Sequence, residues 1–430
     1  MTNDRKVKRN SSALVIIVLS ILVIAGILFL TTNVTFWFKR SIHEDAKRYA
    51  TRHCLVFYPD SKDGKDKAKQ MCKGIKDDRV YDYSLVPFGD YYLVNYGSDI
   101  KYFVDKQYNV ISVNNISDFG KRIISDYLRY TLKKTDFDKY YNVDYINKTS
   151  AENINFDEIT YDFTDEYLTC HFPTYEIDVN VPLKYMQEEI GMNFGYQNEL
   201  YSKPVYIDPN HPVICLTFDD GPQLWYDYNE SSSVMIQNIL HKYDVSATFY
   251  VVGEALTERD AWTDYEVYSF IKESIFNGNE YGSHTHYHDD LEELGATELV
   301  KTINEPAKVL YDLVGYKMKT YRPPYGYFNS YVLSNQPMPA ILWNIDSLDW
   351  SLRDPDEIFE EVMGYKLDDG DVLLFHEIYD ETAQAIDKII PELINKGYQM
   401  VTISDMLKHE GIDINTLSYY YNLNPWPYYE

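Results

Sequence analysis

The pattern of hydrophobic and polar residues divides the chain into three stretches. The first is an uncharged run from Asn10 to Phe38 with an apolar core at 13–32. The second, about 79–200, contains short β-rich segments such as DYYLVNYG and KYFVDKQYNVISV, which predict a hairpin, and an amphipathic helix at 117–134. The third stretch begins near residue 204 and alternates short apolar runs with helical patterns. The chain is therefore expected to contain several separately built parts.

The alternation in the third stretch predicts an α/β domain with a parallel sheet. Seven strands over some two hundred residues fit either a barrel or a doubly wound sheet, and in both the chemistry lies at the carboxyl ends of the strands. The expected strands are 213–218, 247–252, 280–283, 320–322, 340–344, 371–375 and 399–402. The expected helices between them are 233–243, 267–277, 297–314, 355–365 and 382–396.

The apolar run at 13–32 is long enough to cross a bilayer as a helix. Basic residues precede it between positions 5 and 9, and no clear small-x-small cleavage site follows. We therefore expect an uncleaved signal anchor: a single-pass protein of the cell membrane with a cytoplasmic N-terminus and an extracellular catalytic domain. The alternative is a buried core helix.

These features give a domain plan in which the segment after the anchor begins as a helix and forms a stalk. The C-terminal tail, which ends in YYYNLNPWPYYE, either packs back on the preceding domain or contacts a ligand. The predicted parts are a cytoplasmic tail at 1–12, a transmembrane signal anchor at 13–32, a stalk at 33–78, a small α+β domain at 79–203, an α/β catalytic domain at 204–412 and an aromatic tail at 413–430.

Charge and cysteine content narrow the function classes. The chain has 67 acidic against 40 basic residues, a formal net charge of −27. Nucleic-acid binding rests on basic patches, so this class is excluded and neutral substrates are favoured. Cys54 and Cys72 can bridge in an oxidising compartment, whereas Cys215 lies in an apolar run and is expected to be buried in a strand.

Two polar clusters at expected strand ends contain possible metal ligands. Asp219 and Asp220 end the first strand in TFDDGP, and adjacent carboxylates are costly unless a cation compensates one of them. One can bind a metal while the other acts as a base; the alternative is a surface turn. His284 and His288 follow the third strand and are four residues apart, so on a helical turn they face the same way, which is metal-ligand spacing. His286 points elsewhere on such a turn. The alternative here is an exposed His-rich loop.

Two further residues at strand ends are suited to proton transfer or its support. Arg322 in RPPYG can hold a catalytic carboxylate through a bidentate pair, or be a structural arginine in a rigid turn. His376 can act as a general acid held in the right protonation state by an aspartate, or be a satisfied core histidine. Taken together, two imidazoles and one carboxylate with open positions indicate a hydrolytic metal site.

Five short motifs of the α/β part occur in an order that matches a known family. TFDDGP, HTHYH, RPPYG, DSLDW and LLFHE resemble, in order, the five motifs of the polysaccharide deacetylase family (carbohydrate esterase family 4, NodB-homology domain) over about 208–411. The resemblance implies a distorted (β/α)7 barrel and one divalent metal ion, Zn²⁺ in first place, with Co²⁺, Ni²⁺ or Mn²⁺ as alternatives. Residues 79–200 more weakly resemble the small α+β domain that precedes the catalytic domain in some cell-wall deacetylases.

The resemblance also implies residue roles. Asp219 becomes the general base, oriented by Arg322, and His376 becomes the general acid, tuned by Asp349. The remaining roles are as follows: Asp220, His284 and His288 as metal ligands, the Tyr325 backbone N–H as part of the oxyanion site, and Trp350 and Leu374 as walls of the pocket for the acetyl methyl group.

The expected function is metal-dependent hydrolytic N-deacetylation of N-acetylglucosamine residues in a cell-wall polysaccharide, with peptidoglycan as the favoured substrate. The expected partners are an acetylated glycan polymer and the membrane, and no nucleic acid. Two alternatives stay open: an O-acetyl esterase acting on another acetylated glycan, and a catalytically silent glycan-binding protein.

Overall fold

The computed structural model describes residues 116–163, 166–187, 189–190, 201–223, 231–257, 264–416 and 419–421, and before residue 116 five strands and Asp66. The chain divides into two compact units, one formed by 1–116, 160–171 and 182–197, the other by 117–159, 172–181 and 198–430. None of the helices in the described residues combines the length and apolarity that a bilayer span requires. The predicted anchor at 13–32 and the possible Cys54–Cys72 bridge lie outside the described residues.

The first unit contains antiparallel strand pairs. Strands β3 (Tyr83–Phe88), β4 (Tyr91–Tyr96) and β5 (Asp99–Asp105) form a meander, which confirms the expected hairpin. The helix expected at the start of the stalk is wrong at 46–50, because β1 (Ala46–Ala50) pairs with β2 (Leu55–Pro59). The sequence LVFYP in β2 is rich in strand-forming residues, and the preceding segment supplies its partner.

The second unit begins with a helix that the sequence predicted. Helix α3 (Asp118–Thr135) starts at Ser117, whose side chain accepts a hydrogen bond from the Gly120 backbone N–H. It is amphipathic, with Ile123, Ile124 and Leu128 fully buried. The other elements before the parallel strands are α4 (Phe137–Tyr140), α5 (Val143–Lys148), η1 (Phe156–Glu158), β6 (Thr160–Phe163), β7 (Tyr167–Phe172), β8 (Ile177–Pro182) and α6 (Leu183–Met186). Of these, β6, most of β7 and α6 fall in the first unit.

Parallel strands form the centre of the second unit. Strand β9 (Val213–Asp219) lies between β10 (Thr248–Val251) and β14 (Asp371–His376). Beyond β10 comes β11 (Glu280–Ser283), and beyond β14 comes β13 (Ile345–Asp346), while β15 (Gln399–Met400) pairs with the start of β9. Every residue of β9 is buried, including Cys215 as expected, as is typical of a parallel strand covered on both faces.

Two of the expected strands are shorter than predicted. The one at 320–322 is reduced to Tyr321, which bridges Ser283 on one side and Ala340 on the other. Two prolines follow directly and cannot donate ladder hydrogen bonds. The one at 340–344 is limited to β12 (Ala340–Ile341), which pairs with β16 (Tyr419–Tyr420), whereas β13 pairs with β14. The parallel strands and bridges together are consistent with a barrel-like domain.

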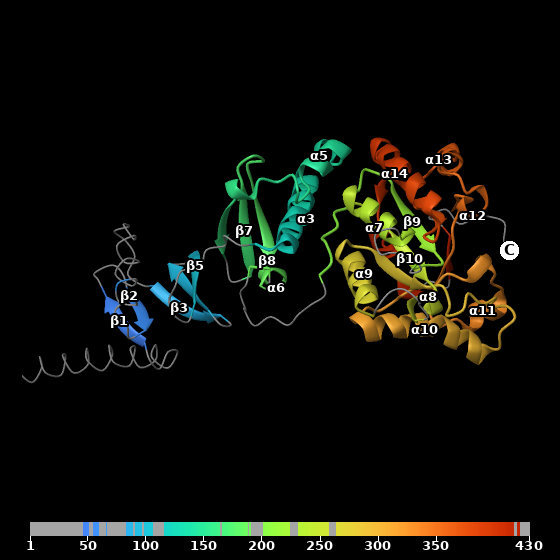
Figure 1. The fold of residues 1–430 in the computed structure, drawn as a ribbon, viewed down its shortest axis with the longest axis horizontal. Helices are drawn as coiled ribbons and strands as arrows, with labels where there is room; N and C mark the ends of the chain where they lie inside the picture. The colour runs from blue at the N-terminus through green and yellow to red at the C-terminus, as the bar shows by residue number, and fades with distance from the viewer. Residues whose placement is uncertain are drawn as a thin grey trace, which may run out of the picture. The chain divides into compact units, whose positions relative to one another are not determined.

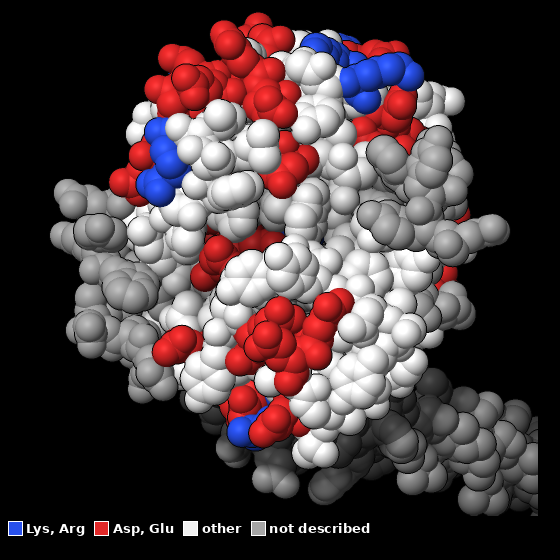
Figure 2. All heavy atoms as spheres, turned by 90° about the vertical axis from the view of Figure 1, so that its right-hand side faces the viewer, with Lys and Arg blue, Asp and Glu red and all other residues white. Residues whose placement is uncertain are grey.

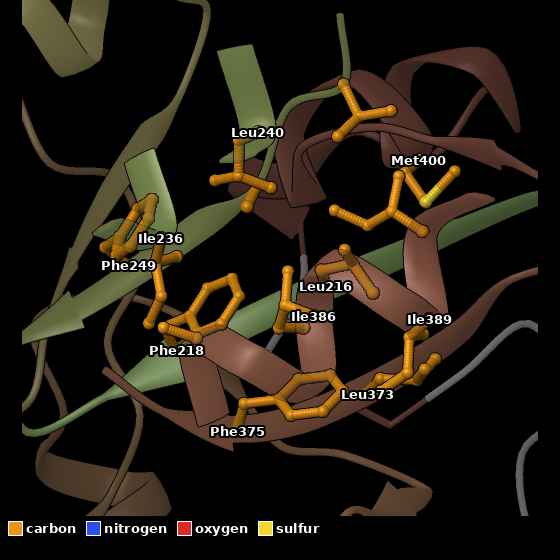
Figure 3. Close-up of a cluster of buried hydrophobic side chains, with 14 of the residues drawn as sticks. Leu216, Phe218, Ile236, Leu240, Phe249, Leu373, Phe375, Ile386, Ile389 and Met400 are labelled. Atoms are coloured by element: carbon orange, nitrogen blue, oxygen red, sulfur yellow. The ribbon is translucent and has the colours of Figure 1, made fainter. Parts of the chain in front are cut away.

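Helices cover the outside of these strands, and all five expected helices are present (Figure 1). Figure 3 shows how Phe218 of β9 and Phe375 of β14 pack with Ile386 of helix α14 (Asp380–Asn395) in a fully buried core, which fixes the two strands that carry the site. The helices are α7 (Ser232–Lys242), α8 (Gly253–Thr257), α9 (Asp264–Phe276), α10 (Ala296–Val314), α11 (Ser330–Asn335), α12 (Asp349–Leu352), α13 (Pro355–Gly364), α14 (Asp380–Asn395) and α15 (Ile403–His409), with 3-10 turns η3 (Pro324–Gly326) and η4 (Ile414–Thr416).

The division into two compact units does not follow the boundary predicted at 203/204, because 117–159 and 172–181 belong to the same unit as the parallel strands. The tail also returns to this unit, since β16 pairs with β12. The boundaries of the six predicted parts of the chain stay predictions.

Candidate metal and hydrolytic site

The carboxyl edge of the parallel strands brings the predicted residues together. Asp219 ends β9 and His376 ends β14, and the strand register places the two directly opposite each other. His284 follows the last residue of β11, and Arg322 follows the bridging residue Tyr321. Side chains separated by up to 157 positions therefore meet at one edge because parallel strands end there.

Asp220, His284 and His288 form the cluster predicted to hold a metal. Their ligand atoms all lie within 4.8 Å of one another. The Asp220 Oδ1 atom is 3.4 Å from His284 Nε2 and 3.3 Å from His288 Nε2. His284 Nδ1 lies 2.9 Å from the Arg322 carbonyl oxygen, so an Nδ1–H donated there leaves the Nε2 lone pair for a cation.

The donor chemistry of this cluster fits a divalent cation. Asp220 Oδ1 is buried and accepts no hydrogen bond. A bound cation would compensate this oxygen by coordination. Asp220 and His288 both occupy left-handed backbone conformations, with φ of 72° and 57°, and such strain is typical of functional sites. Burial is the largest influence on Asp220 and raises its pKa, but the imidazoles of His284 and His288 outweigh it and hold the pKa well below its usual range. Two imidazole nitrogens and one carboxylate oxygen are a donor set that zinc accepts.

Asp219 is held by a fully buried arginine. Arg322 Nη1 donates to Asp219 Oδ1 at 2.8 Å and lies 2.9 Å from Thr217 Oγ1. The expected bidentate pair is wrong: only one guanidinium nitrogen contacts the carboxylate. The reason is that Arg322 Nε and Nη2 donate to the carbonyl oxygens of Ile341 and Leu342, at 3.0 and 3.2 Å.

This arrangement leaves the second oxygen of Asp219 free of the arginine. Asp219 Oδ2 lies 3.6 Å from His284 Nε2, on the side of the candidate metal cluster. The guanidinium itself is packed against the rings of Tyr250 and Trp343, with its central carbon 4.4 and 5.4 Å from their centroids. The arginine is thus fixed on several sides and in turn fixes Asp219.

His376 and Asp349 form a second hydrogen-bonded pair. His376 Nδ1 is 2.7 Å from Asp349 Oδ1, and the His376 backbone N–H donates to Asp349 Oδ2 at 2.7 Å. The hydroxyl of Thr382 also donates to Oδ2, at 2.7 Å. Burial, the largest influence, lowers the pKa of His376, but the Asp349 hydrogen bond and charge raise it to about 9. His376 is therefore suited to carry a proton at neutral pH.

The three predicted substrate-binding residues lie on different elements. Tyr325 sits in η3 with a φ of 60°, and its hydroxyl is 3.1 Å from His288 Nδ1, a contact that the sequence did not suggest. Trp350 is half-exposed on α12, and Leu374 is buried in β14. Their roles at an acetyl group stay predictions.

Sequence reasoning assigned no role to Thr217 and Glu377, which stand in the quoted motifs, and it missed Thr382. Thr217 had a signal, because it lies two positions before Asp219 and so shares its strand face. The carboxylate of Glu377 is buried, and burial raises its pKa to about 8 although Ser233 lowers it in part. A Cβ on Gly221 would lie 1.8 Å from Glu377 Oε1, so the side chain packs directly against the Asp220–Gly221 turn. His286 points away from the ligand cluster, as expected, with Nδ1 at 4.0 Å from Glu305.

Comparison with known proteins identifies relatives of the second unit. A family model described as polysaccharide deacetylase matches residues 207–337. The peptidoglycan-N-acetylmuramic acid deacetylase PdaC of Bacillus subtilis is 37% identical over 200 residues, which are 46% of this chain and 40% of that enzyme's length. A peptidoglycan-N-acetylglucosamine deacetylase of Bacillus cereus is 31% identical over 207 residues, covering 46% of this chain and 70% of its own length. The solved structure of B. subtilis PdaC has 35% identity and a TM-score of 0.42, covering 48% of this chain and 94% of that one.

Proposed function

Because the chain belongs to the polysaccharide deacetylase family, we propose that it is a metal-dependent hydrolase that removes N-acetyl groups from a cell-wall polysaccharide. Peptidoglycan is the proposed polymer and N-acetylglucosamine the proposed sugar. The observation that carries the proposal is the meeting of a metal-competent triad, an arginine-held aspartate and an aspartate-held histidine at one strand edge. The names of the relatives support peptidoglycan, although PdaC is named for N-acetylmuramic acid.

The metal is proposed to bind Asp220, His284 and His288, with Zn²⁺ favoured and Co²⁺, Ni²⁺ or Mn²⁺ as alternatives. A divalent cation there supplies Lewis acidity toward a carbonyl oxygen and makes water easier to deprotonate. The buried unsatisfied oxygen of Asp220 supports this assignment.

The chain's own residues perform the proton transfers. Asp219, oriented by Arg322, accepts a proton from the attacking water as its oxygen bonds to the acetamide carbon. The Tyr325 backbone N–H donates to the developing oxyanion, and Trp350 and Leu374 border the acetyl methyl group. His376 then gives its Nε2 proton to the amide nitrogen as the C–N bond breaks, and acetate and a free amine leave. Asp349 keeps His376 protonated until that step.

We also propose the family's distorted (β/α)7 barrel as the fold of this domain, and the cell membrane as its location. The parallel order of the strands, which the bridges of Tyr321 to Ser283 and Ala340 continue toward β12, supports the first. The uncharged run at 13–32 supports a single-pass anchor with the N-terminus in the cytoplasm and the catalytic domain outside.

Acetate release from purified peptidoglycan by the full chain, with Zn²⁺ added, tests the proposal. We expect release that falls at least 10²-fold in Asp219→Asn and stays unchanged in Asp312→Asn, a surface aspartate of α10. Mass spectrometry of the digested product identifies which sugar has lost its acetyl group. Release from O-acetylated but not N-acetylated glycan would indicate the esterase instead. Absence of release together with absence of bound metal would indicate a silent glycan-binding protein.

A further inference from the structure

The edge that carries the site continues to the C-terminal segment of the chain. Strand β16 is parallel to β12, with Ala340 opposite Tyr419 and Ile341 opposite Tyr420. The Leu342 backbone N–H donates to the Tyr420 carbonyl oxygen at 2.8 Å, and the Leu342 carbonyl accepts from Arg322. Because all these strands run in parallel, the residue after β16 stands at the same edge as Arg322 and Asp219.

The aromatic side chains of this segment alternate between the core and the surface. Tyr420 is buried with Ile341, whereas Tyr419 before it is 43% exposed, as the alternation of a strand requires. The rings of Tyr419 and Tyr421 lie 5.8 Å apart, and the ring of Phe328 lies 5.8 and 6.3 Å from them. These distances are typical of packed aromatic rings. Phe328, Tyr419 and Tyr421 thus form a tail aromatic cluster.

A second group of rings begins at the candidate metal ligands and is linked to the tail aromatic cluster through the chain. The Tyr325 ring lies 4.6 Å from the His288 ring, and the Tyr327 ring lies 5.4 Å from that of Tyr325. Tyr325 and Tyr327 are 58% and 53% exposed, and Phe328 follows Tyr327 directly in the chain. Exposed aromatic side chains at a site rim mark a binding surface, and the flat C–H faces of pyranose rings are a chemical match for them.

We propose that the tail aromatic cluster binds sugar residues of the glycan chain beyond the one that loses its acetyl group. The inference rests on the proposed function and deepens it: the substrate is a polymer, held at two places along its length. An oligosaccharide too short to span both places would bind at the metal cluster alone. Removal of the tail aromatic cluster should therefore impair deacetylation of long glycan chains and leave deacetylation of short ones intact.

The experiment compares the double variant Tyr419→Ala/Tyr421→Ala with the wild-type full chain. Acetate release is measured on a soluble N-acetylglucosamine polymer and on the trimer. We expect KM for the polymer to rise roughly tenfold, equivalent to about 1.4 kcal/mol, with kcat and all trimer values unchanged. Tyr419→Phe/Tyr421→Phe keeps the rings and should behave as wild type, and Tyr265→Ala, an exposed tyrosine of α9 outside both ring groups, is the matched control.

A second measurement separates failure of this inference from failure of the proposed function. Retention on the immobilised polymer is recorded for the wild type and the same variants, independently of acetate release. An active wild type whose double variant keeps its polymer KM would overturn the inference and leave the function standing. If the wild type releases no acetate, weaker retention of the alanine variant supports the inference and equal retention overturns it. A change in oligomeric state in place of a change in retention would also overturn it, because the cluster would then contact a second copy of the chain.

Discussion

At the scale of single residues, the electrostatics of the site assign opposite tasks to two hydrogen-bonded pairs. Arg322 donates to Asp219 Oδ1 and so leaves Oδ2 facing the candidate metal cluster, the position of a proton acceptor. Asp349, fully buried, places a negative charge against His376, which favours a proton donor. Environments that separate a base from an acid in this way are what general acid–base catalysis at neutral pH needs.

The Asp349–His376 pair gives a prediction on pH dependence. The pKa of His376 is raised to about 9, so the acid stays protonated at neutral pH and is lost as the pH rises through that value. In Asp349→Asn the charge and its hydrogen bond are changed, and burial then lowers the pKa of His376 toward its ordinary value of about 6.5. We expect the alkaline limb of the kcat/KM profile for acetate release to move to lower pH by up to about 2.5 units, with up to about a 30-fold loss at pH 8.

Thr382→Val is the control for this prediction. It removes one hydrogen bond to Asp349 Oδ2 but leaves the carboxylate charge facing His376. Its alkaline limb should stay close to that of the wild type. An unshifted limb in Asp349→Asn would show that some group other than His376 supplies the proton.

At the scale of elements, one buried carboxylate joins α3 to the parallel-stranded part of the second unit. Asp244, in the turn after α7, lies 2.9 Å from Lys133 Nζ, 3.2 Å from Lys203 Nζ and 3.7 Å from Arg129 Nη1. Arg129 and Lys133 are four residues apart and so share one face of α3. Burial is the largest influence on Asp244 and raises its pKa, but the three cations outweigh it and hold the pKa well below its usual range.

Removing this carboxylate should destabilise the whole unit. In Asp244→Asn three basic side chains lose their shared partner in a buried place, and we expect about 3 kcal/mol less free energy of unfolding at pH 7. Because the pKa is depressed in the folded state, this stability is present above about pH 4 and is lost as the pH falls below it. Denaturant unfolding at pH 7 and at pH 3 measures both effects, and the difference between variant and wild type should shrink at pH 3.

Asp387→Asn is the matched control, since Asp387 pairs with Lys242 at 2.7 Å on the surface. Exposed pairs contribute little, so its cost should stay within about 1 kcal/mol. Equal costs at the two positions would argue against α3 being held through Asp244.

Local patterns predicted the helices and most parallel strands, because periodicity and apolar runs are properties of neighbouring residues. The motifs predicted the site because parallel strands end at one edge. Contacts between distant segments were not predictable in this way: Asp244 meets Lys133 across 111 positions, and the donors of Arg322 are shared with carbonyl groups that no motif marks. The strand at 46–50 was missed for the same reason, since its partner β2 decides its conformation.

At the scale of the whole molecule, charge becomes part of the interaction with the polymer. The chain carries a formal net charge of −27, and the face in Figure 2 shows many more acidic than basic side chains. An N-acetylated sugar is neutral at the acetamide, whereas the product has an amine that is positively charged when protonated. The field of an acidic protein concentrates cationic ligands near its surface. Each deacetylation should therefore strengthen the attraction between enzyme and chain.

The extent of deacetylation should then determine how tightly the glycan chain binds to the protein. Partially deacetylated glycan, added at pH 6 as a competitor of acetylated substrate, should inhibit acetate release about tenfold more strongly than the same polymer after chemical re-acetylation. In 1 M NaCl the Debye length falls to about 3 Å, and the two polymers should then inhibit alike. The re-acetylated polymer keeps chain length and sugar type constant, so the comparison isolates charge. Equal inhibition already at low salt would mean that contacts with the sugar rings, and not the field of the protein, govern how long the chain stays bound.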